Sequence, residues 1–243
     1  MSAPAFPRAA QRIEAAYRQQ RLRIRSQVLA AVAAAWARLH ADQQQTIQSV
    51  TGLVAAGQGA IAQLVDAYLT QSQIAQVGTG TLKGLDPALY TTTVLRRIAA
   101  PVIYARPFGA YGAFIAQGAD EATAVRAAQA SATKLAATDM QLAQTHAARD
   151  WMTGDAYIVG WRRTLNPPSC KLCTVAASRT YRISDLMPIH EHCDCGVAPL
   201  YGHEPVASVG TTVRIDEDPE IGPRLMADNW SNVGPRLIDK PLA

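Results

Sequence analysis

The cysteines constrain this chain of 243 residues more than any other feature, because all four lie between positions 170 and 195. They form a "CKLC" pair at 170–173 and part of a "HEHCDC" segment at 190–195. A disulfide framework normally connects distant parts of a short secreted chain, whereas thiols that are close in sequence favour a shared metal ion. The clustering therefore predicts a small module that a metal stabilises.

The spacing within this segment predicts a structural zinc site. Two cysteines separated by two residues form a turn that presents both sulfurs to one ion, and thiolate ligands favour zinc over magnesium or calcium. The His190-to-Cys193 spacing repeats that of the CKLC pair and favours Cys193 over Cys195. Four of five candidates are expected to bind Zn²⁺: Cys170, Cys173, His190, Cys193 and Cys195. Four reduced cysteines without a metal are the alternative.

The same residues do not fit the zinc enzymes with which they can be compared. A zinc deaminase needs His-x-Glu upstream of Pro-Cys-x-x-Cys, and the order here is reversed. A peptidase of the His-Glu-x-x-His type needs two histidines one helical turn apart, which "HEHCD" does not supply. The sequence also lacks a GxSxG motif and a Gly-rich phosphate loop. We therefore expect a closed zinc shell and no catalytic residues.

Residues 1–152 are predicted to form an elongated helical body. Apolar residues recur at helical spacing, and Asp86 followed by Pro87 is typical of a helix start. Pro101 and Pro107 are expected to interrupt the pattern. Helices are predicted over 7–45, 46–76, 87–99 and 118–152.

Positive charge is concentrated at the N-terminal end of this body. Residues 1–41 carry seven arginines against one acid, Glu14, although the whole chain has a net charge of only +4. Arg18, Arg21 and Arg25 recur at helical spacing and are predicted to form a basic stripe that contacts DNA or an acidic partner. A solvated helix face is the alternative.

The residues after position 152 predict a change from helices to short strands, so the whole chain is assigned to the α+β class. A small β-containing zinc module is expected over 153–202, because β-branched and aromatic residues flank the CKLC pair. Residues 203–243 are predicted to be an extended tail, with "GPRL" at 222–225 and again at 234–237. This tail is expected to dock on a partner; folding back through its acidic residues onto the Arg-rich helix is the alternative.

The segment 160–200 resembles the C-terminal domain of phage Mu F-like (MuF) minor head proteins, including minor capsid proteins of actinobacterial tailed phages. The shared pattern is a CxxC pair, a Tyr-containing strand, a proline, a histidine and a CxC pair. Pro188, His190, Cys193 and Cys195 match its second half, whereas Glu191 and His192 stand where many relatives have Pro and Asn.

This resemblance implies a minor head protein in the capsid interior or at the portal vertex of a virion, made in the host cytoplasm. Its implied role is head morphogenesis, genome packaging or delivery. The portal protein is the expected partner, followed by scaffold, major capsid protein and packaged DNA. No apolar run reaches the ~18 residues of a membrane span, so no membrane contact is expected. A capsid maturation protease is the second hypothesis, and a zinc-containing nucleic-acid-binding protein is the third.

Overall fold

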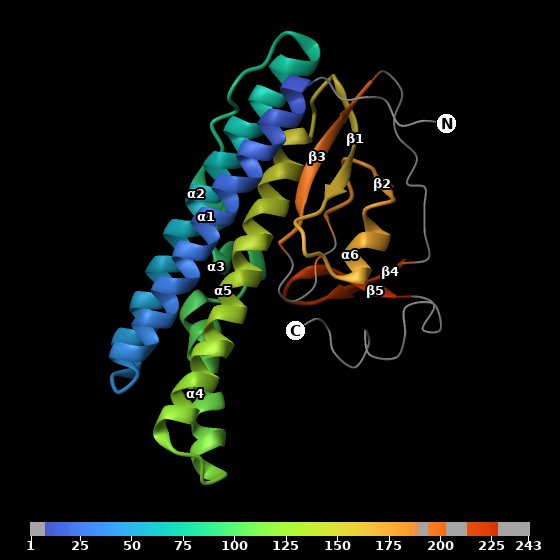
Figure 1. Cartoon of the computed structure of the whole chain (residues 1–243). Helices are drawn as coiled ribbons and strands as arrows, with labels where there is room; N and C mark the ends of the chain where they lie inside the picture. Colours follow the sequence, from blue (N-terminus) through green and yellow to red (C-terminus); the bar gives the residue numbers. More distant parts are fainter. Residues whose placement is uncertain (1–7, 188, 190–193, 203–212, 228–243) are drawn as a thin grey trace.

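The computed structural model describes residues 8–187, 189, 194–202 and 213–227 (Figure 1). Long helices pack side by side, and a small antiparallel sheet lies against one half of their length. The helices are α1 (Arg8–Leu39), α2 (Gln43–Val77), α3 (Thr92–Arg96), α4 (Ala100–Ala116), α5 (Glu121–Met152) and α6 (Lys171–Ala176), with a 3₁₀ turn at Pro87–Tyr90. The strands are β1 (Ile158–Thr164), β2 (Thr180–Tyr181), β3 (Gly196–Tyr201), β4 (Val213–Asp218) and β5 (Gly222–Ala227). This mixture confirms the predicted α+β class.

The first two helices differ from the prediction only where they meet. α1 ends at Leu39 rather than near residue 45, because the Asp42 side chain accepts a hydrogen bond from the Gln45 backbone N–H (2.9 Å) and begins α2. Gly57 lies within α2 and packs closely against its neighbours. A Cβ there would lie 2.6 Å from Cγ2 of Val28, so the absence of a side chain lets α1 and α2 approach each other.

The predicted interruption at the two prolines is wrong. α4 runs through both Pro101 and Pro107 without a break. Pro101 lies in the first turn, where a backbone N–H has no helical partner, so α4 loses no helical hydrogen bond at this position. Pro107 removes one backbone hydrogen bond, but it is buried in the helical body. The long helix predicted to end at Met152 is confirmed as α5, whose start Asp120 caps.

The helices and the sheet share one hydrophobic core. The rings of Tyr17 and Tyr68 stack between α1 and α2 at 4.1 Å, and those of Trp161 and Tyr181 stack between β1 and β2 at 4.1 Å. β1 is the central strand of the order β2-β1-β3. The same buried cluster also includes Trp151 of α5. The sheet therefore packs directly on the helical body.

Residues 213–227 do not form the predicted extended tail. β4 and β5 pair as an antiparallel hairpin, in which Asp218 lies opposite Gly222. The Ile189 N–H also donates to the Pro223 carbonyl (3.1 Å), which ties the hairpin to the chain before β3. The first GPRL segment lies in β5, whereas the second, like 203–212, lies outside the described residues. None of the helices in the described part of the chain is long and apolar enough to cross a membrane.

Candidate functional site

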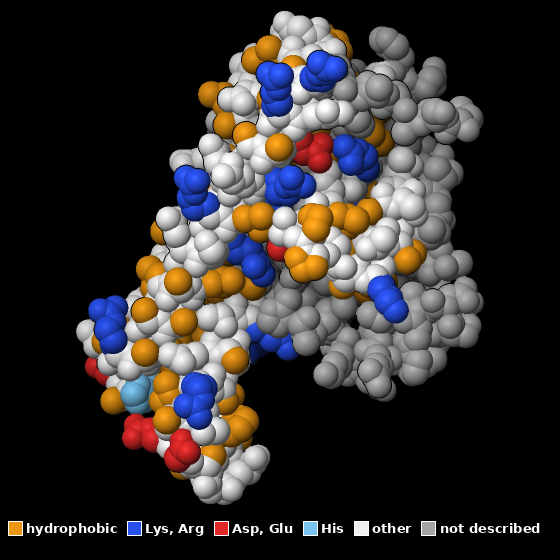
Figure 2. All heavy atoms as spheres, in the orientation of Figure 1, with side chains coloured by type: hydrophobic (Ala, Val, Ile, Leu, Met, Phe, Trp, Pro, Cys, Tyr) orange, Lys and Arg blue, Asp and Glu red, His pale blue; other side chains and the backbone are white. Residues whose placement is uncertain are grey.

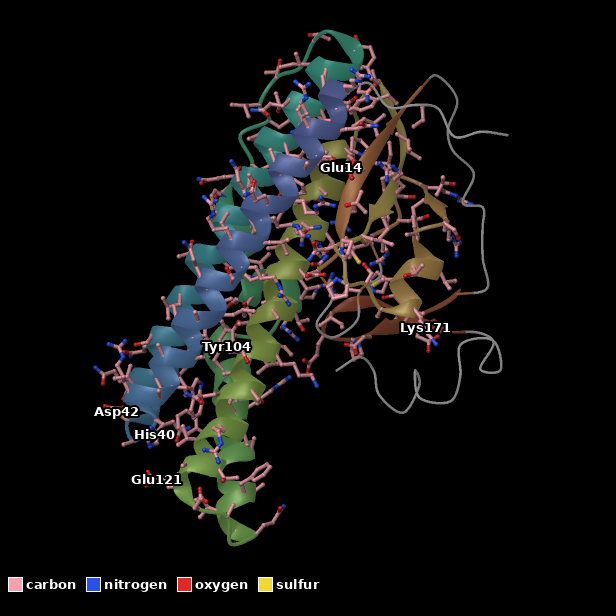
Figure 3. All side chains as sticks on the ribbon, in the orientation of Figure 1. Glu14, His40, Asp42, Tyr104, Glu121 and Lys171 are labelled. Carbon is pink, nitrogen blue, oxygen red and sulfur yellow. The ribbon has the colours of Figure 1, made fainter. Side chains whose placement is uncertain are left out.

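Three of the five predicted metal ligands lie together. Cys173 and Cys195 are each 2% exposed and form one buried cluster, against which Cys170 and Leu165 pack. Cys170 caps the N-terminus of α6, which begins at Lys171 (Figure 3), and its sulfur accepts a hydrogen bond from the Cys173 N–H at 3.3 Å. This is the turn predicted for a CxxC pair.

Thiolates are the ligand type that an ion such as zinc prefers, and three of them lie in this part of the chain. A fourth ligand would come from His190 or Cys193, which both lie outside the described residues. Among the described side chains, no group of three or more His, Cys, Asp or Glu is arranged to hold a metal. Zinc binding therefore stays a prediction. The spacing favoured Cys193 as the ligand from the CxC pair. The cysteine of this pair that the structure describes beside Cys173 is Cys195.

A buried cation lies beside this cluster. Arg163 on β1 is 1% exposed, and its Nη1 lies 3.8 Å from the sulfur of Cys173. Burial raises the pKa of the neighbouring Tyr181, while Arg163 partly offsets that rise. A guanidinium in this position favours negative charge on the sulfur, which is the form that binds metals.

The segment that carries Cys195 is attached to two helices of the body. The Cys195 carbonyl accepts hydrogen bonds from Nε2 of Gln141 (2.9 Å) and of Gln144 (3.0 Å), both buried on α5. The preceding carbonyl, of Asp194, accepts a hydrogen bond from the guanidinium of Arg21 on α1. The candidate metal centre therefore lies at the contact between the sheet and the helices.

The predicted basic stripe is divided between surface and interior. Arg18 is exposed and Arg25 is partly buried, but Arg21 is only 2% exposed. Figure 2 shows Lys and Arg side chains scattered over this face of the molecule rather than gathered in one patch. The prediction that all three face a partner is wrong for Arg21, because its guanidinium binds the carbonyl of Asp194 instead.

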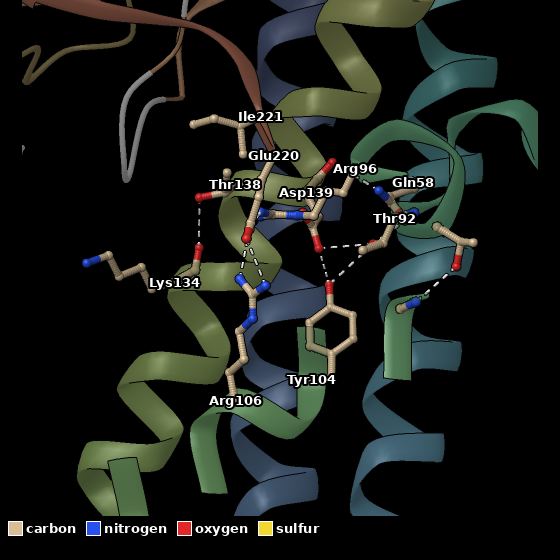
Figure 4. Close-up of polar contacts among 12 residues, drawn as sticks. Gln58, Thr92, Arg96, Tyr104, Arg106, Lys134, Thr138, Asp139, Glu220 and Ile221 are labelled. Carbon is tan, nitrogen blue, oxygen red and sulfur yellow. Dashed lines mark hydrogen bonds and ion pairs between the residues drawn. The ribbon is translucent and has the colours of Figure 1, made fainter. Parts of the chain in front are cut away.

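A buried carboxylate that sequence reasoning missed lies in the helical body (Figure 4). Asp139 on α5 is fully buried, and its oxygens accept from Nε of Arg96 (2.5 Å), the Tyr104 hydroxyl (2.5 Å) and the Thr92 hydroxyl (3.0 Å). Burial raises the pKa of Asp139, and the Arg96 guanidinium opposes that rise. An isolated aspartate in an Ala-rich helix gave no signal of these partners, which lie on α3 and α4.

The turn of the β4–β5 hairpin also contacts Arg96, the arginine that binds Asp139. Glu220 forms ion pairs with Arg106 (2.7 Å) and Arg96 (3.4 Å), and the hydrogen bond from Arg106 is the main reason that the pKa of Glu220 is lowered. The acidic run at 216–220 therefore does fold back, but onto α3 and α4 rather than the Arg-rich α1. Two cavities of about 420 and 400 Å³ flank this turn. His146 lines the first, and burial lowers its pKa to about 4.

No protein-family model, no curated protein and no solved structure matches this chain. The resemblance of residues 160–200 therefore rests on the motif alone. The function is inferred from that motif and from the contacts described above.

Proposed function

We propose that this chain is a structural minor head protein of a tailed phage, associated with the portal vertex and acting in head morphogenesis, genome packaging or delivery. The observation that supports this proposal best is the grouping of Cys170, Cys173 and Cys195. These are cysteines of the motif on which the resemblance rests, and they meet in one buried cluster as a zinc module requires.

The burial of the sulfurs favours a structural role over catalysis. Cys173 and Cys195 are each 2% exposed, and the Cys195 carbonyl is occupied by two glutamine side chains. A substrate would need an open metal position, which this packing does not favour. With His190 or Cys193 as fourth ligand, these sulfurs would hold a zinc ion that crosslinks α6 to the segment before β3.

The shape of the helical body supports attachment to a larger partner. The end formed by α4 and the start of α5 projects beyond the turn between α1 and α2 (Figure 1). Exposed apolar side chains lie along α4, namely Val102, Phe114 and Ile115. These side chains are available for contact with a protein, and the portal is the partner that the proposed function implies.

The localisation of the protein within purified particles tests the proposal. Mass spectrometry of virions should detect the chain at a few copies per particle, and density attributable to it should lie at the portal vertex. Its absence from particles would refute a head protein. A copy number matching that of the major capsid protein would contradict a role at a single vertex.

A cleavage assay tests the protease hypothesis separately. We expect the purified protein to leave the phage scaffold and major capsid protein intact over extended incubation. Cleavage that a chelator abolishes, and that the Glu191→Gln variant lacks, would replace the structural role with an enzymatic one. A matched Glu217→Gln variant controls for the loss of an acidic side chain elsewhere.

A further inference from the structure

We infer that the thiol cluster and the contact between sheet and helices are thermodynamically coupled through the segment Asp194–Cys195, which we call the joint. In this inference, which rests on the proposed zinc site, Arg21, Gln141 and Gln144 are positioning residues. They hold the joint in place for metal binding, and the bound metal in turn strengthens the attachment of the sheet to α1 and α5.

The backbone side of the joint is fixed by three side chains from two helices. Two consecutive carbonyls accept hydrogen bonds from Arg21, Gln141 and Gln144, each at most 2% exposed. Buried donors are rarely left unpaired, because an unmade hydrogen bond in the interior costs about 1–3 kcal/mol. Moving the joint would break all three contacts, so its place relative to the helices is strongly specified.

The side chain of Cys195 belongs to the thiol cluster. The Cys195 side chain packs against Cys173, while the Asp194 carboxylate accepts a hydrogen bond from Nδ2 of Asn166 (2.8 Å). The side chain of Cys195 is therefore a proposed zinc ligand, while its carbonyl contacts a helix. A backbone shift at Cys195 displaces its sulfur and its carbonyl together.

Coupling follows from this double attachment. A ligand already held in position loses less conformational entropy when the metal binds, so the helices raise the affinity of the site. Linkage is reciprocal, so metal binding must stabilise the contacts of Arg21, Gln141 and Gln144 by the same free energy. Loss of the metal, or modification of the thiols, should then loosen the sheet from the helical body.

The test compares Arg21→Met with Arg18→Met in the full-length protein. Methionine retains most of the side-chain length but removes the guanidinium, and Arg18 lies exposed on the same helix. Zinc affinity is measured by competition with a chromophoric chelator at fixed pH, and hydrogen exchange of α1 is measured with and without zinc. We expect Arg21→Met to weaken zinc binding about tenfold and to abolish the zinc-dependent protection of α1, whereas Arg18→Met changes neither.

A milder variant keeps the test valid if Arg21→Met fails to fold. Gln144→Met leaves Gln141 as a donor to the same carbonyl, and we expect it to weaken zinc binding about threefold with an unchanged far-UV spectrum. If both variants bind zinc as tightly as the wild type, the coupling is refuted and the zinc site stands. If the wild type itself binds no zinc under reducing conditions, the zinc site is refuted and the coupling with it.

Discussion

Two buried aspartates organise the helical body at the level of single residues. Asp66 accepts hydrogen bonds from the N–H groups of Lys83 (2.9 Å) and Gly84 (2.8 Å) and from Nε1 of Trp151 (2.9 Å), which fixes the loop after α2. Asp139 binds Arg96, Tyr104 and Thr92. Each carboxylate joins segments far apart in the sequence, so each is a sensitive point for stability.

We expect Asp139→Asn to lower the free energy of unfolding by about 3 kcal/mol, because it leaves the buried Arg96 without its closest charge partner. Urea unfolding followed by circular dichroism measures the change. Glu121→Gln is the control, since Glu121 pairs with His40 at an exposed position and should matter by less than about 1 kcal/mol. Equal small effects for both variants would contradict a stabilising role of the buried pair.

A pair of glycine variants on α2 should have opposite effects. A Cβ at Gly57 would meet Cγ2 of Val28 at 2.6 Å and the sulfur of Met140 at 2.9 Å, and the branched valine cannot rotate away easily. We expect Gly57→Ala to destabilise the protein by about 1–3 kcal/mol through overpacking. Gly52 has open space around it, so Gly52→Ala should stabilise by about 0.5–1 kcal/mol. Thermal unfolding that shifts in the same direction for both would contradict this packing.

At the level of elements, local signals were sufficient for some features and not for others. The regular spacing of apolar residues predicted α2 and α5, because this signal is local in sequence, whereas the caps at Asp42 and Asp120 were not used. The helix through Pro107 was missed, since burial of the proline ring is a tertiary effect. The β4–β5 hairpin was missed because the partner of Glu220, Arg106, is 114 residues away.

In the candidate site, too, some features followed from the local sequence and others depended on tertiary contacts. CxxC spacing was enough to predict the turn at Cys170–Cys173, because a short segment determines it. The grouping with Cys195 follows from where β3 packs on α5, which spacing does not encode. The burial of Arg21 likewise depends on a backbone carbonyl 173 residues away, so helical periodicity alone placed it on the surface.

The docking of the β4–β5 hairpin should depend on Glu220 and on pH. We expect Glu220→Gln to speed hydrogen exchange in β4 and β5 while lowering global stability by less than about 1 kcal/mol, because the ion pair with Arg106 is partly exposed. The pKa of Glu220 is lowered in the folded state, so its contribution is complete above the ordinary glutamate value of about 4.3 and is lost as the pH falls through the lowered pKa. Glu217→Gln, an exposed site on the same hairpin, is the control. Unchanged exchange in Glu220→Gln would contradict docking through this residue.

At the scale of the whole molecule, we expect about one zinc per chain and a broad response to its loss. A structural zinc supplies ~10 kcal/mol or more to a small domain, so Cys170→Ser should unfold the segment from β1 to β3. The shared core means that α1 should also lose protection near Tyr17, while most helical far-UV signal remains. Metal analysis and hydrogen exchange measure these effects. A metal-free wild type under reducing conditions would contradict the prediction.

The contact between Arg21 and Asp194 also has a consequence for biosynthesis. The two residues are 173 positions apart, so at translation rates of ~5–20 residues per second Arg21 leaves the ribosome roughly 9–35 s before Asp194, which precedes β3. During that interval Tyr17 can stack on Tyr68, but it has no sheet to cover it. The nascent helical body therefore presents an apolar surface that β3 covers only late in synthesis. A chaperone that binds this transient surface would act on the chain before the predicted zinc module is synthesised.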